Sequence, residues 1–391
     1  MVIYWEGFCV RKKILILTTC FRPNVGGVET HLDDLINDAG KKGFSFFVLT
    51  YQPLISKTKG EIIEKKKLLS VLRIPWLRFN LFLRLNKHPA LEFLYLFPGL
   101  FAASFIFFMF KSSEVEVIHA QGLVAGAVGL IIGKIFNKKV IVSTHSVYNF
   151  PDLGLYPKFI RLMFINSDYV LTLSQQSKTE VVNLGVPKKK VSVFTYWVNQ
   201  NIFRQLDKRS VRRSLGISKE KFICLFVGRL VPEKGVNELL ESVKISNNNI
   251  TFLVIGDGPM KDDVTGVARV YKNLIFVGRV DNEKLFEYYN ASNLLIVPSI
   301  HEEGFGRVIL ESLSCGLPVI ATNRGGIREY LSKKIGVLID ITPLNIKVNV
   351  EKLMENPKAL NKMSANARAY ANKHFNRKNV TQIIKYYGKE K

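Results

Sequence analysis

The sequence has few cysteines, and their spacing excludes several classes of protein. Four cysteines are spread over 391 residues, so they form neither a metal-binding pair nor the disulfide framework of a small secreted domain. We interpret Cys20, Cys224 and Cys315 as small buried residues, because each lies in or beside an apolar run. This usage of cysteine indicates a reducing compartment.

Two common nucleotide-site patterns are also missing. No Gly-x-Gly-x-x-Gly fingerprint follows an apolar run, which argues against a dehydrogenase. No Asp-x-Asp pair is present of the type that holds a divalent metal in transferases. Four further histidines have no spacing that suits metal ligands; they are His31, His88, His301 and His374. We therefore expect no metal and no cofactor.

Acidic residues are scarce relative to basic ones. The chain has 56 Lys and Arg against 32 Asp and Glu, a net charge of +24. Such an excess concentrates anionic partners, which include lipid headgroups, nucleic acid and phosphorylated substrates. The alternative is a soluble enzyme from a lysine-rich proteome. The basic residues are dispersed and no helix-turn-helix or RRM signature is present, so nucleic-acid binding is a remote alternative.

Long apolar runs are nearly absent as well. The run after Arg11 is short and lacks a small-residue cleavage site, so we interpret it as a first buried strand rather than a signal peptide. Residues 93–110 are uncharged over a length that could span a bilayer, but Pro98-Gly99 interrupts them and a strand follows. A helix buried against the sheet is favoured, and a helix seated shallowly in a membrane is the alternative. A true span would separate strands of one sheet.

Short apolar runs alternate with helical patterns along the whole chain, as in parallel sheets covered by helices on both faces. The chain exceeds the usual size of one core, and the pattern restarts after the polar segment 199–220, which we interpret as a linker. The sequence predicts two doubly wound, Rossmann-like α/β domains, 1–204 and 205–375, with residues 376–391 as a C-terminal helix that could return to the first domain. The expected strands are 13–19, 44–50, 115–119, 139–144, 168–173, 221–227, 250–255, 274–277, 293–297, 317–321 and 335–339. The expected helices include 27–42, 123–136, 174–184, 235–245, 281–290 and 305–314.

A basic segment precedes the long apolar run. Residues 57–87 combine basic side chains with Leu and aromatic residues, which is the composition of a surface that binds anionic lipid. The alternative is a solvated loop and helix face. The basic residues are Lys57, Lys59, Lys65, Lys66, Lys67, Arg73, Arg78, Arg84 and Lys87. The apolar ones are Leu69, Leu72, Trp76, Leu77, Phe79, Leu81 and Phe82.

Three motifs follow expected strands. Gly26-Gly27 opens a helix after the first strand, and two glycines let a ligand approach the free N–H groups of that helix. Gly228-Arg229 ends a buried strand, and Arg229 and Lys234 are two cations that can neutralise a diphosphate. Ligands bind beyond the carboxyl ends of strands in doubly wound folds, so all three motifs lie where a site is expected.

The third motif, residues 303–311, is the most specific. Glu303 lies before an expected helix that begins near Phe305, and Glu311 lies about two turns along it. The N–H groups of Gly304, Phe305 and Gly306 can hold phosphate or orient a sugar. Glu303 can accept hydrogen bonds from sugar hydroxyls and Glu311 from a ribose diol. The apolar residues around Glu311 indicate burial, which requires partners for its carboxylate.

Together these motifs resemble the retaining glycosyltransferase family four, whose members have the GT-B architecture of two domains facing across a cleft. The resemblance covers residues 13–375. Further residues that carry it are Val117 to Ala120, Ser143-Thr144-His145, Gly256 to Pro259, Cys315 to Val319 and Gly325 to Glu329.

The resemblance implies a role for each site residue. Arg229 and Lys234 after Gly228 would hold the donor diphosphate, and Glu311 the ribose. Glu303 and the amides near Phe305 and Gly306 would hold the sugar. In the first domain, His145 would lie under the transferred sugar, and Gly26-Gly27 near the leaving phosphate. The family often has a second histidine where this chain has Gln121, so Gln121 is left without a role.

The function expected is retaining transfer of a sugar from a nucleoside-diphosphate sugar to a membrane-linked lipid or glycan acceptor. The leaving diphosphate would help to remove the acceptor's proton, and the Arg–Lys pair would stabilise it without a metal. The enzyme would be cytoplasmic and peripheral on the inner face of the cell membrane, with an anionic membrane surface as partner and no nucleic acid. A sugar-nucleotide hydrolase or epimerase on the same fold is the alternative.

Overall fold

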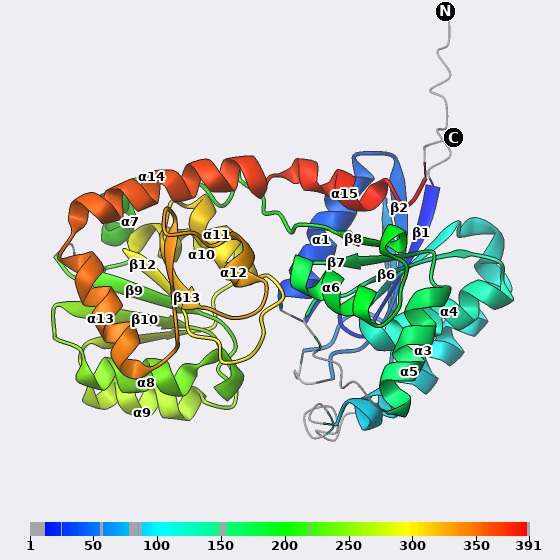
Figure 1. Cartoon of the computed structure of the whole chain (residues 1–391), viewed down its shortest axis with the longest axis horizontal. Helices are drawn as coiled ribbons and strands as arrows, with labels where there is room; N and C mark the ends of the chain where they lie inside the picture. Colours follow the sequence, from blue (N-terminus) through cyan, green and yellow to red (C-terminus); the bar gives the residue numbers. More distant parts are fainter. Residues whose placement is uncertain are drawn as a thin grey trace, which may run out of the picture. The chain divides into compact units, whose positions relative to one another are not determined.

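The chain divides into two compact units. The described residues of the computed structural model are 12–24, 26–54, 58–77, 85, 88–146, 148, 154–218 and 220–388. The first unit runs to Phe194 and takes up the chain again from Val380, and the second unit is Thr195–Asn379. Figure 1 shows that each unit is built around its own sheet.

The polar segment 199–220, interpreted above as a linker, is part of the second unit. It contains α7 (Lys208–Ser214), which packs beside α10 (Leu285–Ala291). Its Arg212 is buried and donates hydrogen bonds to residues 291 and 293 of that unit. The division therefore falls after Phe194 rather than after residue 204, because polar groups of this segment are bonded to other residues of the second unit and not to solvent alone.

The first unit contains an eight-stranded sheet in the order β3-β4-β2-β1-β5-β6-β7-β8. Neighbouring strands are parallel except β3 and β4, which form an antiparallel hairpin. The strands are β1 (Lys12–Thr18), β2 (Phe44–Tyr51), β3 (Ile63–Lys66), β4 (Leu69–Ile74), β5 (Val117–Gln121), β6 (Lys139–Ser143), β7 (Tyr169–Thr172) and β8 (Val191–Val193).

Sequence reasoning missed β3, β4 and β8. Within residues 57–87, where we expected a surface that binds anionic lipid or a solvated loop and helix face, residues 63–74 form the hairpin β3–β4. Its outer strand β3 is largely charged and exposed, and β4 alternates buried and half-buried residues, so neither is a continuous apolar run. Of the apolar residues there, Leu69 is buried and Leu77 is exposed. Lys57, Arg78, Phe79, Leu81, Phe82, Arg84 and Lys87 lie outside the described residues.

Helices cover both faces of this sheet (Figure 1). Helices α3, α4 and α5 share one apolar core with the sheet, and α1 and α15 lie on the other face, where Tyr387 packs on Phe44 and Phe46. The helices are α1 (Gly27–Gly40), α3 (Pro89–Lys111), α4 (Gly122–Ile135), α5 (Leu155–Asn166), α6 (Gln175–Asn183) and α15 (Thr381–Ile384), with short 3-10 turns at Ser112–Glu114, Lys188–Lys190 and Arg377–Val380.

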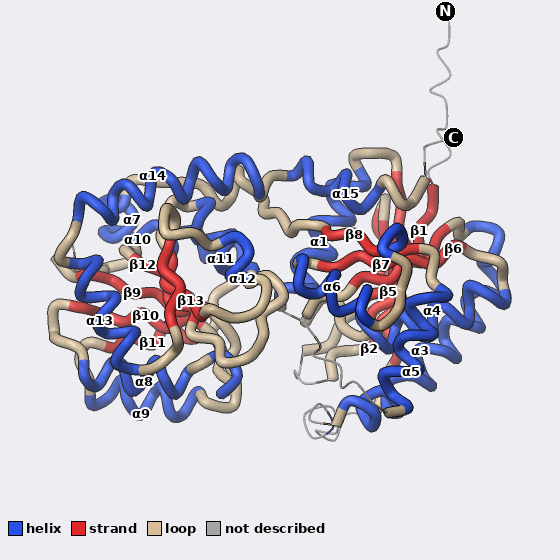
Figure 2. The backbone as a smooth tube through the Cα atoms, in the orientation of Figure 1, coloured by secondary structure: helices blue, strands red, loops and turns tan. Residues whose placement is uncertain are grey.

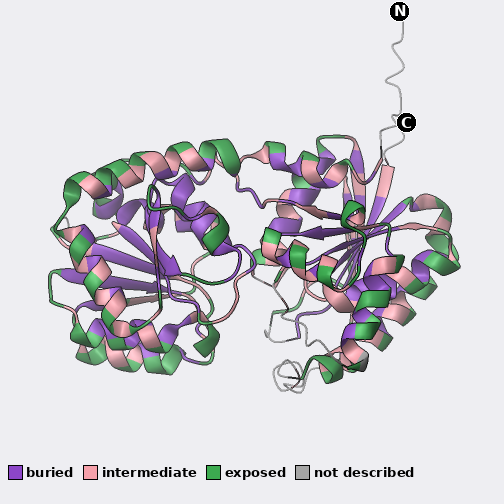
Figure 3. Cartoon of the chain, viewed as in Figure 1, coloured by how far each residue is buried: buried purple, intermediate pink, exposed green. Residues whose placement is uncertain are grey.

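Helix α3 contains the long apolar run, and it is buried along one stripe only. Leu96, Leu100, Ser104 and Phe108 recur every four residues and face the sheet, as a helix of 3.6 residues per turn requires. Its outer side is apolar yet exposed, and 28% of its most apolar 18-residue window is buried. By length and composition α3 could cross a membrane. The expectation of a helix buried against the sheet is therefore right for the row of residues that faces the sheet. It is wrong for the outer side of α3, which is exposed (Figure 3).

The second unit has a six-stranded, fully parallel sheet in the order β11-β10-β9-β12-β13-β14, and each of its strands was expected to within three residues. The prediction of two doubly wound α/β sheets is confirmed (Figure 2). The strands are β9 (Phe222–Val227), β10 (Ile250–Ile255), β11 (Leu274–Gly278), β12 (Leu294–Val297), β13 (Val319–Thr322) and β14 (Gly336–Ile339). The further helices are α8 (Val236–Ile245), α9 (Lys261–Val270), α11 (Arg307–Ser314), α12 (Ile327–Tyr330), α13 (Pro343–Met354) and α14 (Pro357–His374), with 3-10 turns at Pro232–Lys234 and Asn282–Lys284.

Each sheet has one point where the strand order reverses. In the first unit the chain leaves β1 in one direction and resumes with β5 on the other side; in the second, β9 and β12 flank the reversal. Two helices that leave neighbouring strands in opposite directions open a crevice at the carboxyl ends of those strands, where ligands bind. The loops after β1, β5, β9 and β12 are therefore where a site is to be sought.

A buried histidine ties the end of the chain to the first sheet. The side chain of His119 on β5 is fully buried, with Nδ1 2.7 Å from the Tyr387 hydroxyl and Nε2 2.7 Å from Ser143 Oγ. Burial, and secondly the nearby His145, lower the pKa of His119 to about 3. The ring is thus held neutral and paired at both nitrogens.

This neutrality makes the stability of the protein depend on pH. Below about pH 6.5 this histidine binds a proton in the unfolded chain but stays neutral in the folded one. The free energy of unfolding therefore decreases by about 1.4 kcal/mol for each unit by which the pH is lowered. We expect His119→Gln to be less stable at pH 7 but to lose less stability between pH 7 and 5 than the wild type, by thermal unfolding. His88 is exposed, so His88→Gln should keep the wild-type dependence; equal slopes in all three proteins would contradict the assignment.

Candidate active site

Two loops meet at the reversal point of the second sheet. The N–H of Ile300, after β12, donates to the carbonyl of Glu233, after β9, at 3.0 Å. Gly235 has a left-handed φ of 71°, and a Cβ there would lie 1.8 Å from the carbonyl oxygen of Pro298. Only glycine allows the two backbones to approach this closely. The predicted residues of both motifs are thereby brought to one place.

Lys234 and Glu303 form an ion pair across these loops. Lys234 Nζ donates to Glu303 Oε1, and Ser299 Oγ donates to the same oxygen at 2.7 Å. Burial raises the pKa of Glu303, but attraction from Lys234 and His301, with the hydrogen bonds from Lys234 and Ser299, outweighs it and lowers the pKa overall. Glu303 is therefore a carboxylate at neutral pH. Sequence reasoning placed both residues in the site but did not pair them.

The backbone of Glu303 is held by the loop after β13. The N–H of Gly326 donates to the carbonyl of Glu303 at 2.8 Å. Gly325 has a φ of 57°, and a Cβ there would lie 2.3 Å from the same carbonyl oxygen. The two glycines were singled out in the sequence without a role, and the structure shows that they fix the position of Glu303.

Three backbone donors follow Glu303. Among the described residues, no oxygen accepts a hydrogen bond from the N–H groups of Gly304, Phe305 or Gly306. Helix α11 begins at Arg307, two residues later than expected, with Gly306 as its N-cap. The ring of Phe305 is buried and stacks on the ring of Tyr330, with 4.5 Å between the ring centroids. The Tyr330 hydroxyl donates a hydrogen bond to the backbone carbonyl of Phe305. The segment is thus fixed while its N–H groups stay available to a ligand.

Glu311 is closed in by its own unit. It is 1% exposed and accepts hydrogen bonds from Asn282, Tyr289 and Arg307, at 3.1, 2.9 and 3.0 Å. Burial raises its pKa, against the opposing effect of Arg307 and the hydrogen bonds. A carboxylate has about four acceptor positions, so these three donors leave about one of them unused. Sequence reasoning missed these partners, although Arg307 stands four residues before Glu311 on the same helix, the spacing of an ion pair.

Arg229 extends the cationic side of this site. The N–H of Gly228 donates to Ile255 at the end of β10, which turns the chain after β9. Arg229 is exposed and forms no ion pair with any described residue. Its guanidinium is therefore available to an anion, on the same loop as Lys234.

The first unit places the remaining predicted residues at its own reversal point. Gly26 is the extended N-cap of α1, and Gly27 begins the helix. His145 follows β6 and is half-buried, with Nε2 2.8 Å from Gln121 Oε1 at the end of β5. A carboxamide oxygen only accepts hydrogen bonds, so Nε2 of His145 carries the proton. Burial lowers the pKa of His145 to about 4, so the ring is neutral at pH 7.

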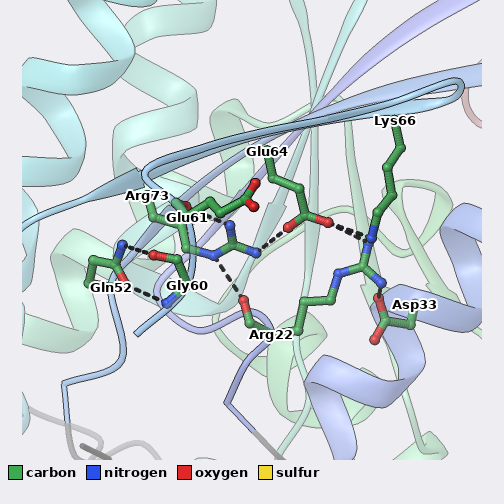
Figure 4. A network of polar contacts seen from close by, with 8 residues as sticks. All are labelled: Arg22, Asp33, Gln52, Gly60, Glu61, Glu64, Lys66 and Arg73. Carbon is green, nitrogen blue, oxygen red and sulfur yellow. Dashed lines mark hydrogen bonds and ion pairs between the residues drawn. The ribbon is translucent and has the colours of Figure 1, made fainter. Parts of the chain in front are cut away.

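A buried arginine holds the loop before Gly26 (Figure 4). Arg73, interpreted above as a surface cation, is 2% exposed because it donates inward, to Arg22 O at 3.0 Å, Glu61 O at 2.8 Å and Glu64 Oε2 at 2.7 Å. Arg22 in turn forms an ion pair with Asp33 on α1, with 3.0 Å between Arg22 Nη1 and Asp33 Oδ1. Burial raises the pKa of Glu64, but hydrogen bonds from Lys66 and Arg73 and the nearby arginines outweigh it and lower that pKa to about 2.

Comparisons with known proteins identify the family. Residues 25–200 match the model of Glycosyltransferase Family 4, and residues 207–370 match that of Glycosyl transferases group 1. The chain is a GT-B glycosyltransferase of this family. An uncharacterized glycosyltransferase of Methanocaldococcus jannaschii is 29% identical over 57% of this chain, and the match spans 61% of that protein's length.

A relative and a solved structure are each similar to this chain over most of its length. The phosphatidylinositol N-acetylglucosaminyltransferase GPI3 subunit of Saccharomyces cerevisiae is 24% identical over 85% of this chain and 73% of that protein. The fold resembles that of Anabaena HepE in complex with UDP-glucose, with a TM-score of 0.76 and 20% identity over 96% of this glycosyltransferase and 98% of HepE.

Gly325 provides a test of how Glu303 is held. Gly325→Ala should lower both thermal stability and transfer activity, because the new Cβ meets the Glu303 carbonyl in addition to the left-handed strain of about 1–2 kcal/mol. Gly216→Ala is the control, since Gly216 has a similar φ of 66° but no atom within 4 Å of the added Cβ. It should lose stability modestly and keep its activity. Equal losses of activity in the two variants would show that backbone strain alone is responsible.

Proposed function

We propose that this glycosyltransferase transfers a sugar from a nucleoside-diphosphate sugar with retention of the anomeric configuration. The observation that carries the proposal is the Lys234–Glu303 pair at the reversal point of the second sheet, beside three N–H groups that have no hydrogen-bond partner among the described residues. Cations and free N–H groups suit a diphosphate, and a carboxylate suits sugar hydroxyls. The UDP-glucose bound to HepE, a protein of the same fold, supports a nucleotide-sugar donor.

In this proposal the chemistry depends on stabilising the leaving group. The bond between the anomeric carbon and the diphosphate oxygen breaks, and the acceptor oxygen bonds to the same face of that carbon. The acceptor's proton passes to the leaving phosphate. Lys234 and Arg229 stabilise the charge that develops on the diphosphate, so no metal is required for that task. The neutral His145 lies against the transferred sugar as a hydrogen-bonding group rather than a base, and Glu311 holds the ribose.

A thermal-shift panel tests the donor. UDP, GDP, ADP, UDP-glucose, GDP-mannose and ADP-glucose are added separately, and a ligand at a hundred times its dissociation constant should add about 2.7 kcal/mol to the free energy of unfolding. We expect one nucleotide to stabilise the wild type clearly, with EDTA present or absent. Lys234→Ala should lower turnover strongly with the fold intact, since it removes charge from the leaving group. Unchanged turnover in that variant would place the diphosphate elsewhere.

The product distinguishes transfer with retention from other outcomes. With donor and acceptor present, NMR of the product should show the donor's anomeric configuration. Consumption of the donor at the same rate without any acceptor would instead indicate a hydrolase.

We further propose that the acceptor is a lipid or lipid-linked glycan and that the enzyme is peripheral on the inner face of the cell membrane. The support is an apolar outer face on the first unit, which consists of exposed residues of α3 and α5. They are Leu91, Leu94, Phe105, Ile106, Met109, Phe110, Phe159 and Leu162. The two helices are in contact, because the rings of Phe93 and Phe159 lie 5.3 Å apart.

The charges around this outer face favour anionic lipid. Helix α3 has no charged residue between Glu92 and Lys111, so nothing charged has to leave water when its centre is covered. Lys158 and Arg161 are exposed on α5 beside Phe159 and Leu162. Basic side chains next to exposed aromatic and aliphatic ones are typical of surfaces that bind anionic membranes. The lipid named for the yeast relative, phosphatidylinositol, is an acceptor of the kind proposed.

Co-sedimentation with vesicles tests the membrane surface. We expect the wild type to bind phosphatidylglycerol vesicles more tightly than phosphatidylcholine ones, and Ile106→Glu with Phe110→Glu to weaken binding at least tenfold, because two inserted side chains are lost. The control is Val270→Glu with Leu344→Glu, at residues that are 73% and 60% exposed in the second unit against 57% and 77% for the α3 pair. Equal loss in both double variants would show a general charge effect, and no binding by the wild type would refute the proposal.

A further inference from the structure

His301 lies on the loop after β12, beside the Lys234–Glu303 pair. Sequence reasoning assigned it no role, because its spacing does not suit a metal ligand. Its Nδ1 lies 2.9 Å from the backbone carbonyl oxygen of Glu233, on the loop after β9. A carbonyl oxygen only accepts hydrogen bonds, so Nδ1 carries a proton. The other ring nitrogen, Nε2, can then make a second hydrogen bond, as an acceptor in the neutral ring or as a donor in the protonated one.

The protein does not use this second nitrogen. Nε2 lies 3.8 Å from Glu303 Oε1, beyond hydrogen-bond distance, and has no hydrogen-bond partner in the described part of the chain. The side chain is 40% exposed, yet the bond to Glu233 fixes the ring. Holding an exposed side chain in one orientation costs conformational entropy. A ring held in this way, with a free nitrogen beside a carboxylate, is suited to binding a ligand.

The loop that carries His301 is fixed as well. The N–H of Ile300 donates to the same Glu233 carbonyl at 3.0 Å, and the carbonyl of Ile300 accepts from Arg324 Nη1 at 2.8 Å. The backbone before the histidine is therefore bonded to the loops after β9 and after β13. A ligand would meet a preformed group here, and little further ordering would be needed on binding.

Glu303 has room for a ligand on one of its oxygens. Oε1 already accepts from Lys234 and from Ser299, which fills its two acceptor positions. Oε2 has no hydrogen-bond partner among the residues that the structure describes. This oxygen and Nε2 of His301 are thus two open hydrogen-bonding groups on neighbouring side chains. Hydroxyl groups on adjacent carbons of a sugar ring match them, because each hydroxyl can both donate and accept.

We propose that His301 helps to select the transferred sugar. Its Nε2 forms a hydrogen bond with one sugar hydroxyl, while Oε2 of Glu303 accepts from the hydroxyl on the adjacent carbon. The sugar is therefore one with two free hydroxyls on adjacent carbons, and a deoxy sugar that lacks either of them is bound more weakly. This inference rests on the proposed function, in which the carboxylate of Glu303 binds sugar hydroxyls.

Two substitutions separate contact with the sugar from positioning of the loop. In His301→Asn the amide nitrogen can still donate to the Glu233 carbonyl in place of Nδ1, but no group replaces Nε2. In His301→Gln the longer side chain places its amide near the position of Nε2 and gives up the bond to Glu233. Contact with the sugar predicts a loss of affinity in His301→Asn, whereas positioning of the loop predicts a loss in His301→Gln.

Affinity is measured by isothermal titration with whichever of UDP-glucose, GDP-mannose and ADP-glucose stabilises the wild type in the thermal-shift panel. His301→Asn should bind this nucleotide sugar about five- to tenfold more weakly, the usual effect of one lost hydrogen bond, and should bind the parent nucleoside diphosphate as the wild type does. His301→Gln should stay close to the wild type with both ligands. The control is His374→Asn, at an exposed histidine that ends α14 in the same unit, and it should change neither affinity.

Deoxy analogues of the same nucleotide sugar, each lacking one hydroxyl, identify the contact. One analogue should bind the wild type and His301→Asn with equal affinity, because the hydroxyl that Nε2 contacts is already missing. The other analogues should keep the difference between the two proteins. A difference of the same size with every analogue would overturn the contact.

The remaining outcomes separate this inference from the proposed function. Wild-type affinity in His301→Asn with a loss in His301→Gln would show that His301 only positions the loop, and wild-type affinity in both variants would show that it has neither role. Either result overturns the contact while the donor site stands. If the wild type binds none of the three nucleotide sugars, the proposed function and this inference fall together.

Discussion

Parallel strand pairing is the constraint on which the rest of the structure depends. Because crossovers return the chain to the same edge of a sheet, all carboxyl ends of parallel strands lie together. The loops after β9 and β12 therefore come into backbone contact, as between Glu233 and Ile300, which lie 67 positions apart in the sequence. This contact requires a left-handed glycine at position 235, where any side chain would meet Pro298. Without it Lys234 and Glu303 would not form a pair.

The two glutamates of one motif have different environments and therefore different capacities. One oxygen of Glu303 accepts from both Lys234 and Ser299, and the N–H groups that follow it have no partner in the part of the chain that the structure describes, so a ligand can rearrange its surroundings. Glu311 is enclosed by Arg307, Tyr289 and Asn282, which anchor the helix that carries it. A buried carboxylate needs such partners whether or not it also binds substrate. The surroundings of Glu303 can thus change when a ligand binds, whereas Glu311 stabilises the packing of its helix.

Sequence reasoning succeeded where the physical signal is local. Buried parallel strands such as β9 and β10 are continuous apolar runs, and the glycine loops after them are visible as motifs. It failed for β3, which is short, charged and at the edge of the sheet, and for Arg73, whose inward direction depends on carbonyls more than 10 and 50 residues away. Hydrogen-bond partners such as those of Gln121 and Glu311 depend on side-chain geometry between distant elements, which no spacing along the chain contains.

The last residues of the chain complete the core of the first unit, because Tyr387 pairs with His119 and packs on Phe44 and Phe46. A ribosome that has released residues 12–194 has therefore produced a sheet whose central histidine is still without one of its partners. The second unit, a continuous segment of the chain, can fold as soon as it emerges. The first unit is thus synthesised first and completed last, and a chain truncated before Tyr387 would lack a partner for His119, more than 250 positions earlier in the sequence.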